Sequence, residues 1–204
     1  MLHTIFNPDN VVFRAINKIG CLWLLNILWV ICSLPIFTIG ASTTALIYST
    51  RKLRNDDGYP IQNFFASFKE NFKQATLIWL IYLAAGAMLL FSIIFWNQMK
   101  SPVARILWAV SLFFAAVYSA TLLYVFAIQS RFYNGVFATI KYAFFMSYVN
   151  IVETVLMGLI VFAVVVLNLF TSVIVNFITL NFGVALMMYL LGFHYEKVFS
   201  RYIP

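Results

Sequence analysis

Glu153 is the one acidic residue inside an apolar run of this sequence, which makes it the first candidate for chemistry. A carboxylate within a membrane is costly enough that a functional role is the default hypothesis. The sharper interpretation is a proton or substrate site with Asn26 and Asn176 as neutral partners. The simpler one is that Glu153, near the start of its helix, reaches the interface or pairs with Arg131 or Lys141. The asparagines then form helix–helix hydrogen bonds or lie in loops.

The other reactive side chains form no recognisable constellation. Neither His3 nor His194 has a Cys, Asp or Glu set at metal-ligand spacing, and Glu196 diverges from His194 by about 200° on a helix. Cys21 and Cys32 lie in one apolar run, and we interpret both as small apolar side chains. No phosphate-binding glycine loop occurs. We therefore predict no catalytic residue, no cofactor and no metal, and a chain that is not an enzyme.

The composition indicates which class of protein carries these residues. Of the 204 residues, 64% are hydrophobic and only 9% are charged, whereas soluble domains carry about 25% charged residues. A water-soluble fold could not cover its surface with so few charges, but a membrane protein can, because its lateral surface faces lipid. We expect one all-α, polytopic membrane helix bundle over residues 1–204, with lipid as its surroundings and no nucleic-acid partner.

The apolar runs predict about six transmembrane helices, since a span needs about 20 residues. The runs cover residues 19–34, 36–50, 75–96, 103–129, 148–170 and 172–195. Pro35 and Gly40 interrupt the first pair, because proline breaks the helical hydrogen-bond ladder and glycine tolerates a tight turn. Residues 19–50 are therefore two short spans or one long kinked helix, and the second case gives five spans.

Small residues follow this break and permit close approach of another helix. The candidate packing or partner surface consists of Pro35, Gly40, Ala41, Ser42 and Thr44. These residues pack inside the bundle or receive a partner protein, and packing is the commoner use.

Residues 62–74 predict an amphipathic helix that lies on the membrane surface and extends this candidate partner surface. Phenylalanines share one face at 100° per residue, and charged residues occupy the other. The apolar face carries Phe64, Phe65, Phe68 and Phe72.

A weak internal repeat recurs at an offset of 72 residues. Phe65-Ala66-Ser67-Phe68-Lys69 is similar to Phe137-Ala138-Thr139-Ile140-Lys141. The two units would lie near residues 36–96 and 104–170. Internal symmetry is common in transporters, but a few matches in lipid-adapted sequence also arise by chance, so both explanations stay open.

The basic residues predict the orientation. With six spans, eleven of the 13 Lys and Arg residues fall on one side, and only Lys100 and Arg105 fall on the other. The positive-inside rule then places both termini in the cytoplasm.

Two segments of the first eighty residues carry a resemblance. They are Cys-Ser-Leu-Pro-Ile-Phe-Thr-Ile-Gly-Ala at 32–41 and Phe-Lys-Glu-Asn-Phe-Lys-Gln-Ala at 68–75. The chain resembles the YesL-like family of bacterial membrane proteins, a family of unknown function whose members are often encoded beside carbohydrate ABC importers. The resemblance implies the plasma membrane of a Gram-positive bacterium and a part in oligosaccharide uptake, and it carries over no catalytic residue.

Two hypotheses follow. The first is a non-enzymatic accessory protein that packs against the permease subunits of a carbohydrate ABC importer or assists their assembly. The alternative is a stand-alone small transporter or channel with a polar site at the bilayer midplane. A homo-oligomer is compatible with either.

Overall fold

The computed structural model describes residues 11–170 and 172–202, and the regular structure in these ranges is helical throughout. Its α-helices are α2 (Val11–Ser33), α3 (Ile39–Arg54), α4 (Pro60–Gln98), α5 (Pro102–Gln129), α6 (Val136–Val149), α7 (Ile151–Phe170), α8 (Val173–Ile178) and α9 (Val184–Phe199). A 3-10 turn (η1, Ile36–Thr38) lies between α2 and α3, and a π-helical turn (η2, Thr179–Gly183) lies between α8 and α9. The prediction of an all-α chain is confirmed.

Within the described residues, five helices are long and apolar enough to cross a membrane, so the chain is of the multi-pass membrane type. These segments are Arg14–Ser33, Pro60–Gln98, Pro102–Gln129, Ile151–Phe170 and Val175–Phe199. The run expected as a second span forms α3, which has 16 residues. A helix of that length rises about 24 Å, less than the roughly 30 Å hydrocarbon core of a bilayer. The count is five because α3 is short, and not because residues 19–50 form one kinked span.

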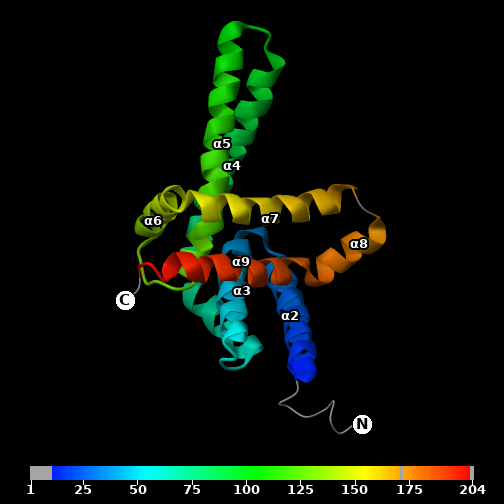
Figure 1. Cartoon of the computed structure of the whole chain (residues 1–204). Helices are drawn as coiled ribbons and strands as arrows, with labels where there is room; N and C mark the ends of the chain where they lie inside the picture. The colour runs from blue at the N-terminus through cyan, green and yellow to red at the C-terminus, as the bar shows by residue number, and fades with distance from the viewer. Residues whose placement is uncertain (1–10, 171, 203–204) are drawn as a thin grey trace.

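The break at Pro35 is a turn between two helices. The helix α2 ends at Ser33, and Thr38 closes the turn, because its hydroxyl lies 2.6 Å from the carbonyl oxygens of both Cys32 and Pro35. The chain then reverses, and α3 runs back beside α2 (Figure 1).

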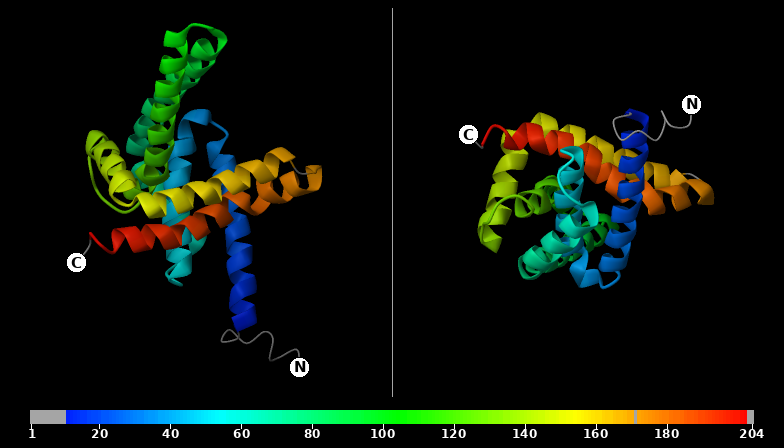
Figure 2. Two further views of the ribbon diagram at one scale, coloured as in Figure 1. Left: turned by 45° about the horizontal axis from the view of Figure 1, so that its top comes forward. Right: turned by 90° about the horizontal axis from the view of Figure 1, so that it is seen from below.

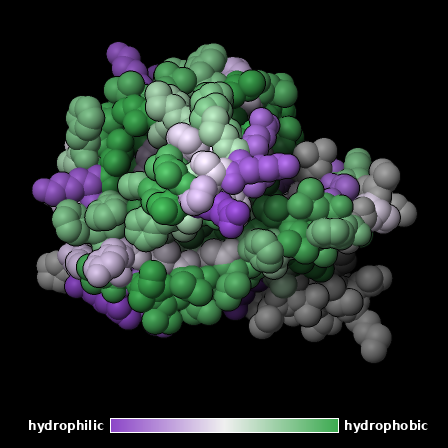
Figure 3. Space-filling view, turned by 90° about the horizontal axis from the view of Figure 1, so that it is seen from above, coloured by the Kyte–Doolittle hydropathy of each residue, from purple (hydrophilic) through white to green (hydrophobic). Residues whose placement is uncertain are grey.

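The helices α4 and α5 form a long hairpin that rises beyond the rest of the molecule (Figure 1). The helices α7 and α9 lie side by side and antiparallel, and they run across the base of this hairpin (Figures 1 and 2). Seen from the hairpin tip, the surface is mostly hydrophobic, with polar side chains in small groups (Figure 3). This antiparallel pairing brings the start of α7 next to the end of α9, which decides where Glu153 lies.

The amphipathic segment at 62–74 differs from expectation, because it is the first part of α4 and continues without a break into the span. Phe64 is fully buried, and Phe68 packs against the same core cluster, which includes Leu25 of α2 and Leu46 of α3. The phenylalanine face therefore packs largely against other helices, and only Phe65 is well exposed, at 48%.

The proposed repeat stays a prediction. Its two units differ in one respect, because α4 is continuous where the second unit breaks at Asn150 between α6 and α7.

Candidate functional site

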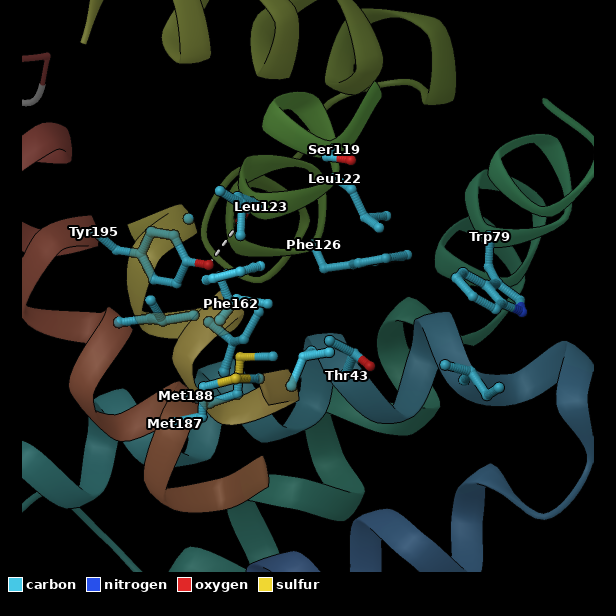
Figure 4. Close-up of a pocket in the computed structure, with 16 residues that line it drawn as sticks. Thr43, Trp79, Ser119, Leu122, Leu123, Phe126, Phe162, Met187, Met188 and Tyr195 are labelled. Carbon is cyan, nitrogen blue, oxygen red and sulfur yellow. Dashed lines mark hydrogen bonds between the residues drawn. The ribbon is translucent and has the colours of Figure 1, made fainter. Parts of the chain in front are cut away.

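A cavity of about 500 Å³ lies between α3, α4, α5, α7 and α9 (Figure 4). Its wall is mainly apolar and includes Trp79, Phe126, Phe162 and Met187. Tyr195 also lines it, but its hydroxyl is already used, because it donates a 2.7 Å hydrogen bond to a backbone carbonyl of α5. The lining contains no charged residue, so the cavity suits an apolar group and offers no acid or base.

Glu153 does not line this cavity and is not a free carboxylate. It is 4% exposed, and its two oxygens lie 2.7 Å from Nδ1 of His194 and 2.5 Å from Nζ of Lys197. Both partners belong to the last turns of α9, which face the first turn of α7. The expected pairing with Arg131 or Lys141 is therefore wrong, and the carboxylate joins α7 to α9.

The start of α7 carries further hydrogen bonds to its neighbours. The hydroxyl of Thr154 donates to the backbone carbonyl of Ser147 at 2.8 Å and lies 3.1 Å from the hydroxyl of Tyr124. The side chain of Asn150 accepts a 2.9 Å hydrogen bond from Arg201, beyond the end of α9. These contacts fix the start of α7, which carries Glu153, against α5 and the C-terminal end of α9.

Asn26 supports the break between α8 and α9. It is fully buried, and its side-chain oxygen accepts a 2.9 Å hydrogen bond from the backbone N–H of Ala185. Ala185 follows the π-helical turn, where the regular ladder of backbone hydrogen bonds is interrupted. The simpler expectation for this asparagine, a hydrogen bond between helices, agrees with the structure.

Asn176 lies elsewhere, at a cavity of about 410 Å³ that Asn168 and Thr179 also line. Neither Glu153 nor Asn26 lines that cavity. The structure therefore does not bring Glu153, Asn26 and Asn176 together as one polar site, because each lies at a different helix junction.

The small-residue segment packs inside the molecule. Gly40, Ala41, Ser42 and Thr44 are all buried in α3. A Cβ atom on Gly40 would lie 2.4 Å from the carbonyl oxygen of Ala75 and 2.6 Å from Cβ of Trp79, so the glycine allows α3 to touch α4. Pro35 alone of this set is exposed. The packing interpretation agrees with these contacts.

A second ion pair was not visible in the sequence. The guanidinium of Arg54 in α3 lies 2.8 Å from the carboxylate of Glu196 in α9, and it donates to the carbonyl of Tyr189 at 2.9 Å. The positive-inside rule placed Arg54 and the C-terminal end on one side of the membrane, which was the available signal. Spacing could not reveal the pair, because 142 residues separate its members.

The chain is similar to a known protein family and to a bacterial protein. The family described as "Protein of unknown function, DUF624" matches residues 22–93, a range that contains both resemblance segments. The chain is similar to "Uncharacterized protein YesL" of Bacillus subtilis (strain 168), at 28% identity over 164 residues, which are 78% of this chain and 75% of that protein. No solved structure matches the chain significantly.

Proposed function

The family match and the Bacillus relative support this chain as a member of the YesL-like family, and from that premise we propose that it is a non-enzymatic accessory protein of the bacterial membrane. Its partner is the permease of a carbohydrate ABC importer, and the α4–α5 hairpin is the contact surface. The sugar-importer part of this proposal rests on the family resemblance alone.

The observation that carries the proposal is the outer half of the hairpin. Beyond Tyr82 no side chain of α4 is buried, and before Thr121 only Ala104 and Ser111 of α5 are. Large apolar side chains are instead exposed there, among them Phe91 at 70%. This half therefore has a surface that no other described part of the chain covers.

The hairpin is preorganised for a contact. The hydroxyls of Ser92 and Ser111 lie 2.7 Å apart and join its two helices. Tyr118 donates a 3.0 Å hydrogen bond to the carbonyl of Tyr82 and packs against Gly86. A rigid pair of helices pays little conformational entropy on binding.

The transporter alternative has less support. A transporter needs a polar cavity at the bilayer midplane. The cavity of about 500 Å³ between α3, α4, α5, α7 and α9 has an apolar wall instead. The carboxylate that would serve such a site, Glu153, is held by His194 and Lys197. The accessory hypothesis requires no such cavity.

Site-specific photocrosslinking in the native bacterium tests the proposal. A benzophenone amino acid replaces Phe91 in α4 or Phe113 in α5, and the control replaces Leu159 in α7, which is 57% exposed but lies outside the hairpin. We expect adducts with the permease subunits from both hairpin positions and none from Leu159. Adducts with lipid alone, or equal permease adducts from Leu159, would refute the hairpin as the contact surface.

A further inference from the structure

A separate, polar cavity of about 180 Å³ lies where α3, α4 and the α5–α6 loop meet. Two guanidinium groups line it, one from Arg51 in the last turn of α3 and one from Arg131 just after α5. Both residues lie outside the candidate spans, and Arg131 follows the end of one of them by two residues. The cavity is therefore at the level where a span meets the aqueous phase.

Neither arginine forms an ion pair with a carboxylate among the described residues. The paired carboxylates are Asp56 with Lys18, Asp57 with Lys52, Glu153 with His194 and Lys197, and Glu196 with Arg54. Glu70 also lines the cavity, but it is exposed and forms no ion pair within the described part of the chain. The lining therefore carries two positive charges and one negative charge.

Aromatic rings hold both guanidinium groups in place. The guanidinium of Arg51 lies 5.3 Å from the ring centre of Tyr48, and that of Arg131 lies 5.4 Å from the ring centre of Phe199. These cation–π contacts fix the place of both guanidinium groups beside the cavity.

The charge of Arg131 destabilises the charge of Arg51. Burial lowers the pKa of Arg51, and the charge of Arg131 lowers that pKa further. Burial likewise lowers the pKa of Arg131, and the nearby charge of Glu196 raises the pKa of both arginines. Both groups remain cationic at neutral pH, because an arginine does not lose its proton in proteins. A bound anion would relieve this repulsion.

The neutral wall of the cavity is fixed by hydrogen bonds across three helices. Gln129 donates to the side-chain oxygen of Asn71 at 3.0 Å, and Asn71 donates to the carbonyl of Ser67 at 3.0 Å. Thr139 of α6 donates to the oxygen of Gln129 at 3.4 Å. These hydrogen bonds between α4, α5 and α6 fix the neutral wall of the cavity.

We propose that this cavity binds a phosphate group, carried by an anionic lipid or by a small soluble molecule. Two guanidinium edges suit a tetrahedral oxyanion, because each can donate two parallel hydrogen bonds to phosphate oxygens. The volume of the cavity is several times the roughly 30 Å³ that one water occupies, which is enough for a phosphate group. Basic pockets beside transmembrane helices are suited to lipid headgroups. The inference does not depend on the proposed permease contact.

Binding to the purified full-length protein tests this site. The protein is held in a neutral detergent, and the probes are phosphatidylglycerol, phosphatidylcholine as the lipid control, and inorganic phosphate. The variants are Arg51→Gln, Arg131→Gln and Glu70→Gln. Arg105→Gln, a cation at the hairpin tip, is the matched control. Native mass spectrometry counts retained lipid, and thermal shift reports phosphate binding and confirms that each variant folds.

We expect each of Arg51→Gln and Arg131→Gln to weaken binding by about tenfold, Glu70→Gln to strengthen it, and Arg105→Gln to leave it unchanged. Retention of phosphatidylglycerol without a response to inorganic phosphate assigns the site to a headgroup, and saturable binding of inorganic phosphate assigns it to a soluble ligand. Binding that survives both arginine substitutions, or that Arg105→Gln weakens equally, would overturn the proposal.

Discussion

The Arg54 guanidinium and the Glu196 carboxylate meet at 2.8 Å and join α3 to α9. The side chain of Arg54 is 5% exposed. Its guanidinium fits here because Gly192 has no side chain, and a Cβ atom at that position would occupy the same space. Two residues before Glu196, His194 contacts Glu153 of α7. Because residues two apart on a helix point in nearly opposite directions, α9 forms ion pairs with α3 on one face and with α7 on another.

Substitution of Gly192 tests the first of these joints. A Cβ atom there would lie 1.6 Å from Nη1 of Arg54, so Gly192→Ala must displace the guanidinium from Glu196 and from the carbonyl of Tyr189. We expect a loss of about 1–3 kcal/mol in the free energy of unfolding, measured by denaturation in detergent.

Two controls accompany Gly192→Ala. Gly158→Ala has no atom within 4 Å of the new Cβ, so it should not destabilise the protein and should gain about 0.5–1 kcal/mol from the higher helix propensity of alanine. Arg54→Gln removes the same ion pair, so the double variant should lose little more than either single one. Fully additive losses would contradict the contact.

The second joint is tested by a double-mutant cycle between Glu153 and His194. Glu153→Gln leaves His194 and Lys197 without their buried acceptor, so we expect a coupling energy of about 0.5–3 kcal/mol between Glu153→Gln and His194→Gln. The matched cycle with Lys141→Gln should be additive. A larger coupling with Lys141 would restore the pairing that the sequence suggested.

Much of the fold could be predicted because its signals are local. The end of α2 at Ser33 and the start of α5 at Pro102 follow from where apolar runs meet proline. The continuity of α4 was not predicted, because the change from an amphipathic to an apolar pattern after Gln74 suggests a boundary although no helix-breaking residue lies there.

The candidate site was less predictable, because its contacts are tertiary. Glu153 stands out in the sequence by its cost in lipid, but its partner His194 is 41 residues away, and only the antiparallel pairing of α7 and α9 brings the two together. The same limit applies to Arg131, which the sequence suggested as a partner of Glu153 although it shares a cavity with Arg51.

Gly40 gives a prediction about the contact of α3 with α4. Gly40→Ala places a methyl group against the backbone oxygen of Ala75 and Cβ of Trp79, neither of which can rotate away. The helices must separate, and we expect a loss of about 1–3 kcal/mol in unfolding free energy. Gly20→Ala, with no atom within 4 Å of the new Cβ, is the control and should stabilise the helix by about 0.5–1 kcal/mol. Equal effects of the two substitutions would contradict this packing.

Cysteine labelling tests the predicted orientation of the hairpin. In a background of Cys21→Ser and Cys32→Ser, a single cysteine replaces Ser101 at the hairpin tip or Tyr133, which is 89% exposed in the α5–α6 loop. More Lys and Arg residues lie on the side of Tyr133 than on the side of Ser101, so the positive-inside rule places Tyr133 in the cytoplasm. We expect a membrane-impermeant maleimide to label Ser101→Cys in intact cells and Tyr133→Cys only after the membrane is opened. Opposite labelling would invert the orientation and place the arginine cavity on the external side, where cytoplasmic phosphates could not reach it.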